Sequence, residues 1–279
     1  MKFKNINISI CQLEVLDDKD LNLQKAKKYI VKSAKEGANI VVLPAMFNCP
    51  YRTSKFRIFA EEESNSKTID IISNLAKENK VYIVAGSIPE KEGDKYYNTS
   101  YVFDEEGHTI AKHRKIHLYD VDIKNKLKIK ESDVFSPGQN ITVFDTKYGK
   151  IGLLISYDIR FPEMFRIMAD MGADIIIVPS AFNEETGKKH WDNLIKVRSM
   201  DNQVFVVAVS PARKKDEKYI VYGHSKIVDP YGKILCELDE NEGIKTCSVN
   251  MEYLSELRRE FPLLEHRRLD LYNVVKKDL

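Results

Sequence analysis

The chain has 279 residues, 43% of them hydrophobic, so it is long enough for one large core or for two small domains. Its 44 basic and 42 acidic residues nearly cancel, which argues against nucleic acid or an anionic membrane as a partner. No stretch approaches the roughly 20 apolar residues that span a bilayer, and the N-terminal segment lacks the apolar centre of a signal peptide.

The earliest apolar run, residues 6–13, is one of six that have the length of a strand and are rich in Val and Ile. The others are residues 39–45, 81–88, 150–156, 174–180 and 204–211. None has the alternation of a half-exposed sheet, which indicates strands that are buried on both faces.

Helical periodicity occupies segments between these runs. It appears at residues 20–37, 66–80 and 161–172, with Gly37 and Gly172 as stop signals. Strands that alternate with helices predict a layered α/β protein. Residues 248–272 then indicate a strand end, a helix and an extended tail.

No linker or repeat divides the chain, so we expect a single domain over residues 1–279. The C-terminal tail, from about residue 253 to 279, is expected to pack on the body or on a partner subunit through Phe261, Leu263 and Leu264.

The four cysteines, Cys11, Cys49, Cys236 and Cys247, form no CxxC pair and no metal-ligand pattern. We therefore expect a reducing, cytoplasmic location and no metal site. Cys49, within a loop, is interpreted as an ordinary thiol.

Chemistry in layered α/β folds gathers just past the carboxyl ends of buried strands. Here such positions are residue 45, residue 156, residues 180–183 and residues 210–213, to which we add the basic segment around Lys115.

Ser156 ends the apolar part of "GLLISYDIRFPE" and raises the question of a serine nucleophile. The flanking glycines of a nucleophile elbow are absent. A base would have to be His117, His190 or His224, and spacing does not choose among them. A plainer interpretation is that the Ser156 hydroxyl caps the following helix.

Longer motifs occur in a fixed order along the chain. They are "IVVLP" with "FNCPY", "AKHRKIHLYD", "ESDVFSPGQ", "KIGLLISYDIRFPE", "VPSAFN", "HWDNLIKVRSMDNQVFVVAVSPA" and "GHSKIVDPYGKIL". From about Asn7 to Tyr272 the chain strongly resembles the nitrilase superfamily of carbon-nitrogen hydrolases, and within it the omega-amidases most of all.

The resemblance implies an α-β-β-α sandwich of four layers. The same resemblance implies a homodimer or a larger assembly, and catalysis without a cofactor. It also implies a Glu after "VVLP" as general base, a Lys in "RKIHL", a Cys that ends "GLLI" as nucleophile, and a second Glu in "ESDVFSPG". Lys115 and Glu131 match two of these positions. Ala45 stands at the general-base position and Ser156 at the nucleophile position.

Both replacements remove a reactive side-chain group that the implied reaction needs. A serine hydroxyl supplies essentially no anion unless a base takes its proton, and Ala45 offers none. We therefore predict an inactive or nearly inactive chain. Two explanations are open, engineered inactivation and a natural pseudoenzyme that binds or scaffolds. We favour the first because both changes are small and fall on reactive positions.

The resemblance implies further roles in the site. Lys115 and the backbone N–H of Tyr157 would meet the oxyanion. Arg160 would grip a substrate carboxylate, with a salt bridge to Asp158 or Glu163 as the equal alternative. Phe182, Asn183 and His190 are expected to line or support the pocket, and Trp191 to do so or to belong to the core.

The implied substrate is a small amide, namely a short dicarboxylic monoamide such as 2-oxoglutaramate or 2-oxosuccinamate. An N-carbamoyl amino acid or carbamoylputrescine amidohydrolase is the neighbouring alternative, which the sequence does not exclude.

Overall fold

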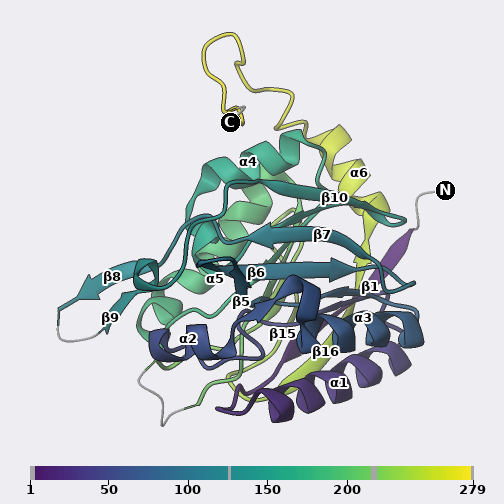
Figure 1. Ribbon diagram of the computed structural model, residues 1–279. Coiled ribbons are helices and arrows are strands. Elements are labelled where there is room, and N and C mark those ends of the chain that lie inside the picture. The colour runs from purple at the N-terminus through teal and green to yellow at the C-terminus, as the bar shows by residue number, and fades with distance from the viewer. Residues whose placement is uncertain (1–3, 125–126, 215–218, 278–279) are drawn as a thin grey trace.

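The computed structural model describes residues 4–124, 127–214 and 219–277 (Figure 1). Its strands are β1 (Asn5–Gln12), β2 (Ile40–Val42), β3 (Glu61–Glu62), β4 (Tyr82–Val84), β5 (Ile88–Glu92), β6 (Lys95–Phe103), β7 (Thr109–Arg114), β8 (Asp120–Ile123), β9 (Leu127–Lys130), β10 (Thr142–Thr146), β11 (Gly149–Leu153), β12 (Ile175–Pro179), β13 (Phe205–Val209), β14 (Lys226–Val228), β15 (Ile234–Glu237) and β16 (Gly243–Asn250). Its α-helices are α1 (Lys19–Lys35), α2 (Thr53–Phe59), α3 (Lys67–Asn79), α4 (Pro162–Asp170), α5 (Glu184–Asn202) and α6 (Met251–Glu260). Three short 3₁₀ turns are η1 (Glu63–Asn65), η2 (Glu131–Asp133) and η3 (Ser156–Arg160).

The strands form two large sheets and one projecting hairpin. The first sheet has the order β16-β1-β2-β4-β6-β5-β3, with β7 on β6, and the second has the order β10-β11-β12-β13-β14-β15. Each has three adjacent parallel strands at its centre, with antiparallel strands on both sides. Hairpin β8–β9 extends away from the body (Figure 1).

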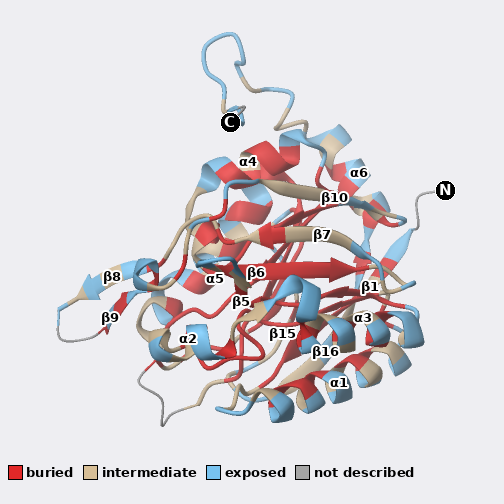
Figure 2. Cartoon of the chain, viewed as in Figure 1, coloured by how far each residue is buried: buried red, intermediate tan, exposed pale blue. Residues whose placement is uncertain are grey.

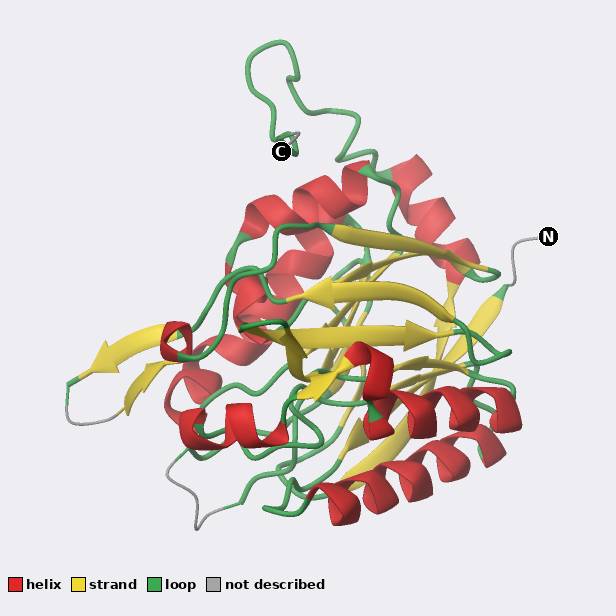
Figure 3. Cartoon of the chain, in the orientation of Figure 1, coloured by secondary structure: helices red, strands yellow, loops and turns green. Residues whose placement is uncertain are grey.

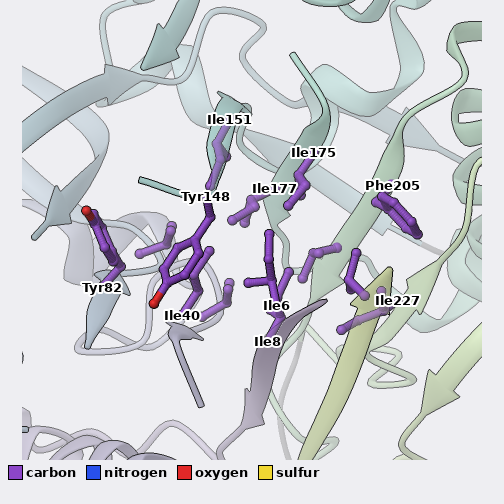
Figure 4. Packing of buried hydrophobic residues seen from close by; sticks show 14 of the residues in the cluster. Ile6, Ile8, Ile40, Tyr82, Tyr148, Ile151, Ile175, Ile177, Phe205 and Ile227 are labelled. Atoms are coloured by element: carbon purple, nitrogen blue, oxygen red, sulfur yellow. The ribbon is translucent and has the colours of Figure 1, made fainter. Parts of the chain in front are cut away.

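Successive side chains of the central strands point to opposite faces, and both faces are buried. Ile40 and Val42 of β2 join the core between the sheets, whereas Val41 lies in the outer cluster. Ile175 and Ile177 of β12 reach the same inner core from the second sheet (Figure 4). This explains why the apolar runs show no alternation.

Helices cover the outer face of each sheet (Figure 3). Apolar side chains of α1 and α3 pack on the first sheet, and those of α4 and α5 pack on the second. The central strands are accordingly buried while the helices expose one side to solvent (Figure 2). The predicted α/β sandwich of four layers, α-β-β-α, is confirmed.

Local signals mark the helix boundaries, and the two predicted stop signals, Gly37 and Gly172, are among them. Asp18 begins α1, because its carboxylate accepts a hydrogen bond from the Leu21 N–H at 3.0 Å. Gly37 and Gly172 follow α1 and α4 with φ values of +83° and +90°, where glycine is favoured.

The C-terminal segment is only partly attached to the body. The Arg258 guanidinium of α6 donates to the Asp174 carboxylate at 2.8 Å, and Leu264 packs against the cluster beneath α4 and α5. Phe261 is 53% exposed, so it does not pack on the body as Leu264 does. The Arg267 guanidinium also donates two hydrogen bonds to the Asp170 carboxylate of α4, and the residues beyond it extend as a loop (Figure 1). Packing on a partner subunit stays a prediction, as does the single domain.

Candidate active site

Two adjoining pockets lie past the carboxyl ends of the central strands. The larger is lined by Ala45, which follows β2, and the smaller by Ser156, which follows β11. Ala181, just after β12, and Tyr219 line both pockets. Ala45 and Ser156, the two positions predicted to lack their reactive groups, therefore lie in pockets that share part of their wall.

Lys115 and Glu131 form a direct ion pair behind these pockets. The Lys115 ammonium donates to Glu131 Oε2 at 2.6 Å, and neither side chain is exposed to solvent. Glu131 also accepts hydrogen bonds from the Tyr51 hydroxyl and the Tyr119 N–H, both at 2.6 Å. A buried carboxylate with three donors is well compensated, which fixes the position of the ammonium beside it.

Two tyrosines connect this pair to the pockets. Tyr51 lines the larger pocket with Ala45, and Tyr119 lines the smaller one with Ser156. Burial, followed by the nearby Glu131 carboxylate, raises the pKa of Tyr51 well above its usual range, so its phenol remains a donor. Periodicity and spacing gave no signal for these tyrosines, because their roles arise from contacts between distant segments.

The backbone at both pockets is strained. Ser156 has φ +49° and Met46, directly after Ala45, has φ +54°. Side chains with a Cβ rarely adopt this left-handed conformation, which costs on the order of 1–3 kcal/mol at each position. Such strain clusters at functional sites, so both turns are candidates for a role beyond packing.

The Ser156 hydroxyl accepts a hydrogen bond from the Ala181 N–H at 3.3 Å. The expectation that it caps the next helix is therefore wrong, because Ser156 is itself the first residue of turn η3 and its hydroxyl accepts from no N–H of η3 or α4, which the structure describes in full. Within the described ranges, no histidine bonds to the Ser156 hydroxyl. His117 is instead paired with Asp158 through Nδ1 at 2.9 Å.

Arg160 does not line the smaller pocket but lies beside two residues that do, Tyr157 and Phe182. Its guanidinium lies 5.0 Å from the centre of the Phe182 ring and 5.8 Å from that of Tyr157, and donates to His190 Nδ1 at 3.2 Å. In the part of the chain that the structure describes, it forms no ion pair with Asp158 or Glu163, so the salt-bridge alternative is wrong.

The other predicted pocket residues divide between lining and support. Phe182 and Asn183 line the smaller pocket, and the Asn183 side chain also begins α5 by accepting from the Glu185 N–H at 2.9 Å. His190 is exposed and contacts Arg160. Trp191 is fully buried and belongs to the core, with its indole N–H bonded to the His224 carbonyl.

Comparison with known proteins identifies the family. The family model described as carbon-nitrogen hydrolase matches residues 7–259. An omega-amidase, NIT2-A of Xenopus laevis, is 43% identical over 99% of this chain and 99% of its own length. The crystal structure of Saccharomyces cerevisiae Nit3, a nitrilase-superfamily member, superposes with a TM-score of 0.87 at 42% identity, covering 95% of this chain and 97% of that one. The chain belongs to the carbon-nitrogen hydrolase family.

Other relatives agree with this assignment. The mouse omega-amidase NIT2 is 42% identical over 97% of this chain and 98% of its own length. The NitFhit protein of Caenorhabditis elegans superposes with a TM-score of 0.87 at 29% identity, covering 98% of this chain and 68% of that one. By family, the protein is an amidase-type hydrolase.

Cys49 lines the larger pocket of this carbon-nitrogen hydrolase, four residues beyond Ala45. Its side chain is completely buried, and its thiol lies 3.4 Å from the Pro50 carbonyl. Burial raises the pKa of Cys49 far above its usual range. A thiol held protonated is a poor nucleophile, which agrees with the interpretation of an ordinary loop cysteine.

None of the helices in the described ranges is both long enough and apolar enough to cross a membrane. Over the same ranges, no three side chains of His, Cys, Asp or Glu gather into a group that could hold a metal ion.

Proposed function

We propose that this carbon-nitrogen hydrolase is an omega-amidase scaffold whose general base and nucleophile positions hold Ala45 and Ser156. With Glu and Cys at those positions it would hydrolyse 2-oxoglutaramate, 2-oxosuccinamate and similar monoamides, and as it stands it would turn over little or none. The observation that carries the proposal is the buried Lys115–Glu131 pair behind the pockets that Ala45 and Ser156 line.

In the proposed reaction of a chain with both groups restored, the cysteine thiolate at position 156 attacks the amide carbon and the carbonyl oxygen becomes an oxyanion. The Lys115 ammonium and the Tyr157 N–H would stabilise that charge, which is usually the largest single contribution to catalysis. The carbon–nitrogen bond then breaks, and the departing amine takes the thiol's proton through the glutamate at position 45 and leaves as ammonia. Water hydrolyses the thioester to the carboxylic acid and restores the thiol.

The two replacements would each disable this sequence. Removing the nucleophile of a comparable hydrolase costs on the order of 10⁶ in turnover, and a general base contributes about 10²–10⁴. The groups act as a unit, so the losses overlap instead of multiplying.

Arg160 supports a substrate that carries a carboxylate. Its guanidinium lies near the rings of Tyr157 and Phe182, which line the smaller pocket, and a guanidinium binds a carboxylate through two parallel hydrogen bonds. The same arrangement would serve an N-carbamoyl amino acid, which keeps that class as the second candidate substrate.

Ammonia release from 2-oxoglutaramate tests the proposal. We would compare this chain with the Ala45→Glu, Ser156→Cys double revertant, and with the double revertant that also carries Lys115→Met. The expected result is a silent chain, an active double revertant and a triple variant that has lost most of that activity. A folded double revertant that is inert on amides, nitriles and carbamoyl compounds would refute the amidase assignment and favour a binding or scaffolding protein. Activity in the chain as it stands would refute the account of Ala45 and Ser156.

We also propose that the protein is a homodimer. Exposed apolar side chains near the ends of two helices support this, namely Val197 and Met200 of α5 and Phe261 after α6, and the Gln203 amide joins these ends by donating to the Phe261 carbonyl at 2.7 Å. Light scattering after size exclusion should give twice the chain mass, and Met200→Glu should shift the protein toward monomer.

A further inference from the structure

Asp158 lies fully buried between two segments that carry proposed site residues. Its Oδ1 accepts hydrogen bonds from the backbone N–H and the ring Nδ1 of His117, both at 2.9 Å. Its Oδ2 accepts from the Ile155 N–H at 3.1 Å and faces Nε2 of His113 at 3.6 Å.

The two backbone contacts link the proposed reactive positions. His117 comes two residues after Lys115, and Ile155 comes directly before Ser156. Since both N–H groups bond to one carboxylate, the Lys115 segment cannot shift relative to residue 156 without breaking a charge-assisted hydrogen bond.

The surroundings restrict the carboxylate from every side. The His117 ring stacks on Phe161 with ring centres 3.5 Å apart, and the His113 ring is held by the Thr142 hydroxyl at 3.0 Å. The Arg198 guanidinium donates to the Ile159 and Arg160 carbonyls and fixes the other side of turn η3. Burial raises the pKa of Asp158, but the nearby His113 ring and the hydrogen bonds from His117 outweigh it and hold that pKa well below its usual range.

The geometry points to Asp158 as a positioning residue that fixes Lys115 relative to residue 156 for the proposed reaction. A residue that merely capped turn η3 would need only the Ile155 contact. Asp158 also bonds to a segment 41 residues away, the one that carries the proposed oxyanion cation. The inference rests on the proposed roles of Lys115 and residue 156.

Steady-state kinetics of the Ala45→Glu, Ser156→Cys revertant provide the first test. Asp158→Ala should lower kcat about 100-fold, the typical cost of a displacement of about 1 Å, with KM changed less than about threefold. Asp158→Asn keeps one acceptor oxygen, so it should recover part of the loss. The control is Asp174→Asn, which removes a largely buried carboxylate from the opposite end of the second sheet and should leave kcat within about twofold. An unchanged kcat, or a rise in KM alone, would overturn the inference.

Alkylation by iodoacetamide of the cysteine that the revertant carries at position 156 provides a second test, which needs no amide substrate. A Lys115 ammonium in place favours the thiolate, so Asp158→Asn should slow alkylation at neutral pH by about tenfold. Losing the negative charge of Asp158 would by itself favour the thiolate and speed alkylation, so the two effects have opposite signs. An unchanged or faster rate would overturn the inference. Peptide mapping against the parent chain, which has Ser156, corrects for the other cysteines.

The two tests fail separately. A double revertant that is inert on every amide refutes the proposed function, while its alkylation rates still decide whether Asp158 positions the Lys115 segment. Because Asp158→Asn is nearly isosteric, it serves in both tests where Asp158→Ala does not fold.

Discussion

Replacing Glu131 with Gln should destabilise the fold through the cation that it leaves behind. The Lys115 ammonium lies 2.6 Å from the Glu131 carboxylate, and both side chains are fully buried. Breaking a buried pair by removing one partner costs about 3–5 kcal/mol. The amide oxygen of Gln still accepts from Tyr51, so we expect the lower end, about 3 kcal/mol, which lowers the melting temperature by roughly 6 °C for a chain of this size.

Adding Lys115→Met should then restore stability. The second substitution removes the unpaired charge and leaves an apolar side chain beside a neutral amide, so the double variant should regain at least about 1 kcal/mol over Glu131→Gln. Urea denaturation followed by circular dichroism measures all three variants. The matched control is Asp122→Asn, which breaks the exposed Lys128–Asp122 pair and should cost less than about 0.5 kcal/mol. A double variant less stable than Glu131→Gln would refute this account of the pair.

Three further predictions concern other parts of the protein. Gly86→Ala should lower the free energy of unfolding by about 2–4 kcal/mol, because the new Cβ would lie 1.9 Å from the Pro44 carbonyl oxygen. Gly93 also has a positive φ but faces open space, so Gly93→Ala should lower it by only about 1 kcal/mol. Equal losses in thermal unfolding would contradict the clash. Cys247 should react fastest with iodoacetamide among the four cysteines of the parent chain, because the other three are buried and the neighbouring Cys236 lowers the pKa of Cys247; first labelling at Cys11 or Cys49 would contradict this. The stability advantage of the parent over Asp158→Asn should shrink as pH falls below about 4. A carboxylate with a depressed pKa contributes stability above its unfolded pKa of 3.8 and loses that contribution as pH falls toward its folded pKa. An advantage that shrinks already between pH 8 and 6 would contradict this.

The fold could be predicted because its local signals agree with one another. Valine- and isoleucine-rich runs marked the central strands, and Gly37 and Gly172 marked helix ends that the structure places close by. Two-sided burial of the parallel strands is what makes such runs continuous, so they also indicated the layers. Antiparallel strands such as β7 and β8 are only partly buried and gave weaker signals.

The site was predictable only in part. Lys115 and Glu131 were matched by resemblance to the family, and their contact depends on hairpin β8–β9 folding back between them, which spacing does not determine. The salt-bridge alternative for Arg160 failed because Asp158 was already occupied by His117 and the Ile155 N–H. Capping by Ser156 failed because its hydroxyl accepts from the Ala181 N–H, which belongs to a segment distant in the sequence. Competition among donors for one acceptor is a tertiary property that a single sequence does not display.

The strand orders of the two sheets correspond to each other. In each sheet, one antiparallel strand lies beside three parallel strands, and an antiparallel pair lies on their other side. These groups are β16, β1-β2-β4 and β6-β5 in the first sheet. They are β10, β11-β12-β13 and β14-β15 in the second sheet. The molecule is thus built like a dimer of two half-sandwiches joined in one chain. The site residues are divided between the two halves, with Ala45, Lys115 and Glu131 in the first and Ser156 in the second. A chain divided before β10 would have to reassemble its two sheets face to face across the inner core. Its second part would also have to return β16 to the edge of the first sheet, beside β1, before any chemistry at that junction could be restored.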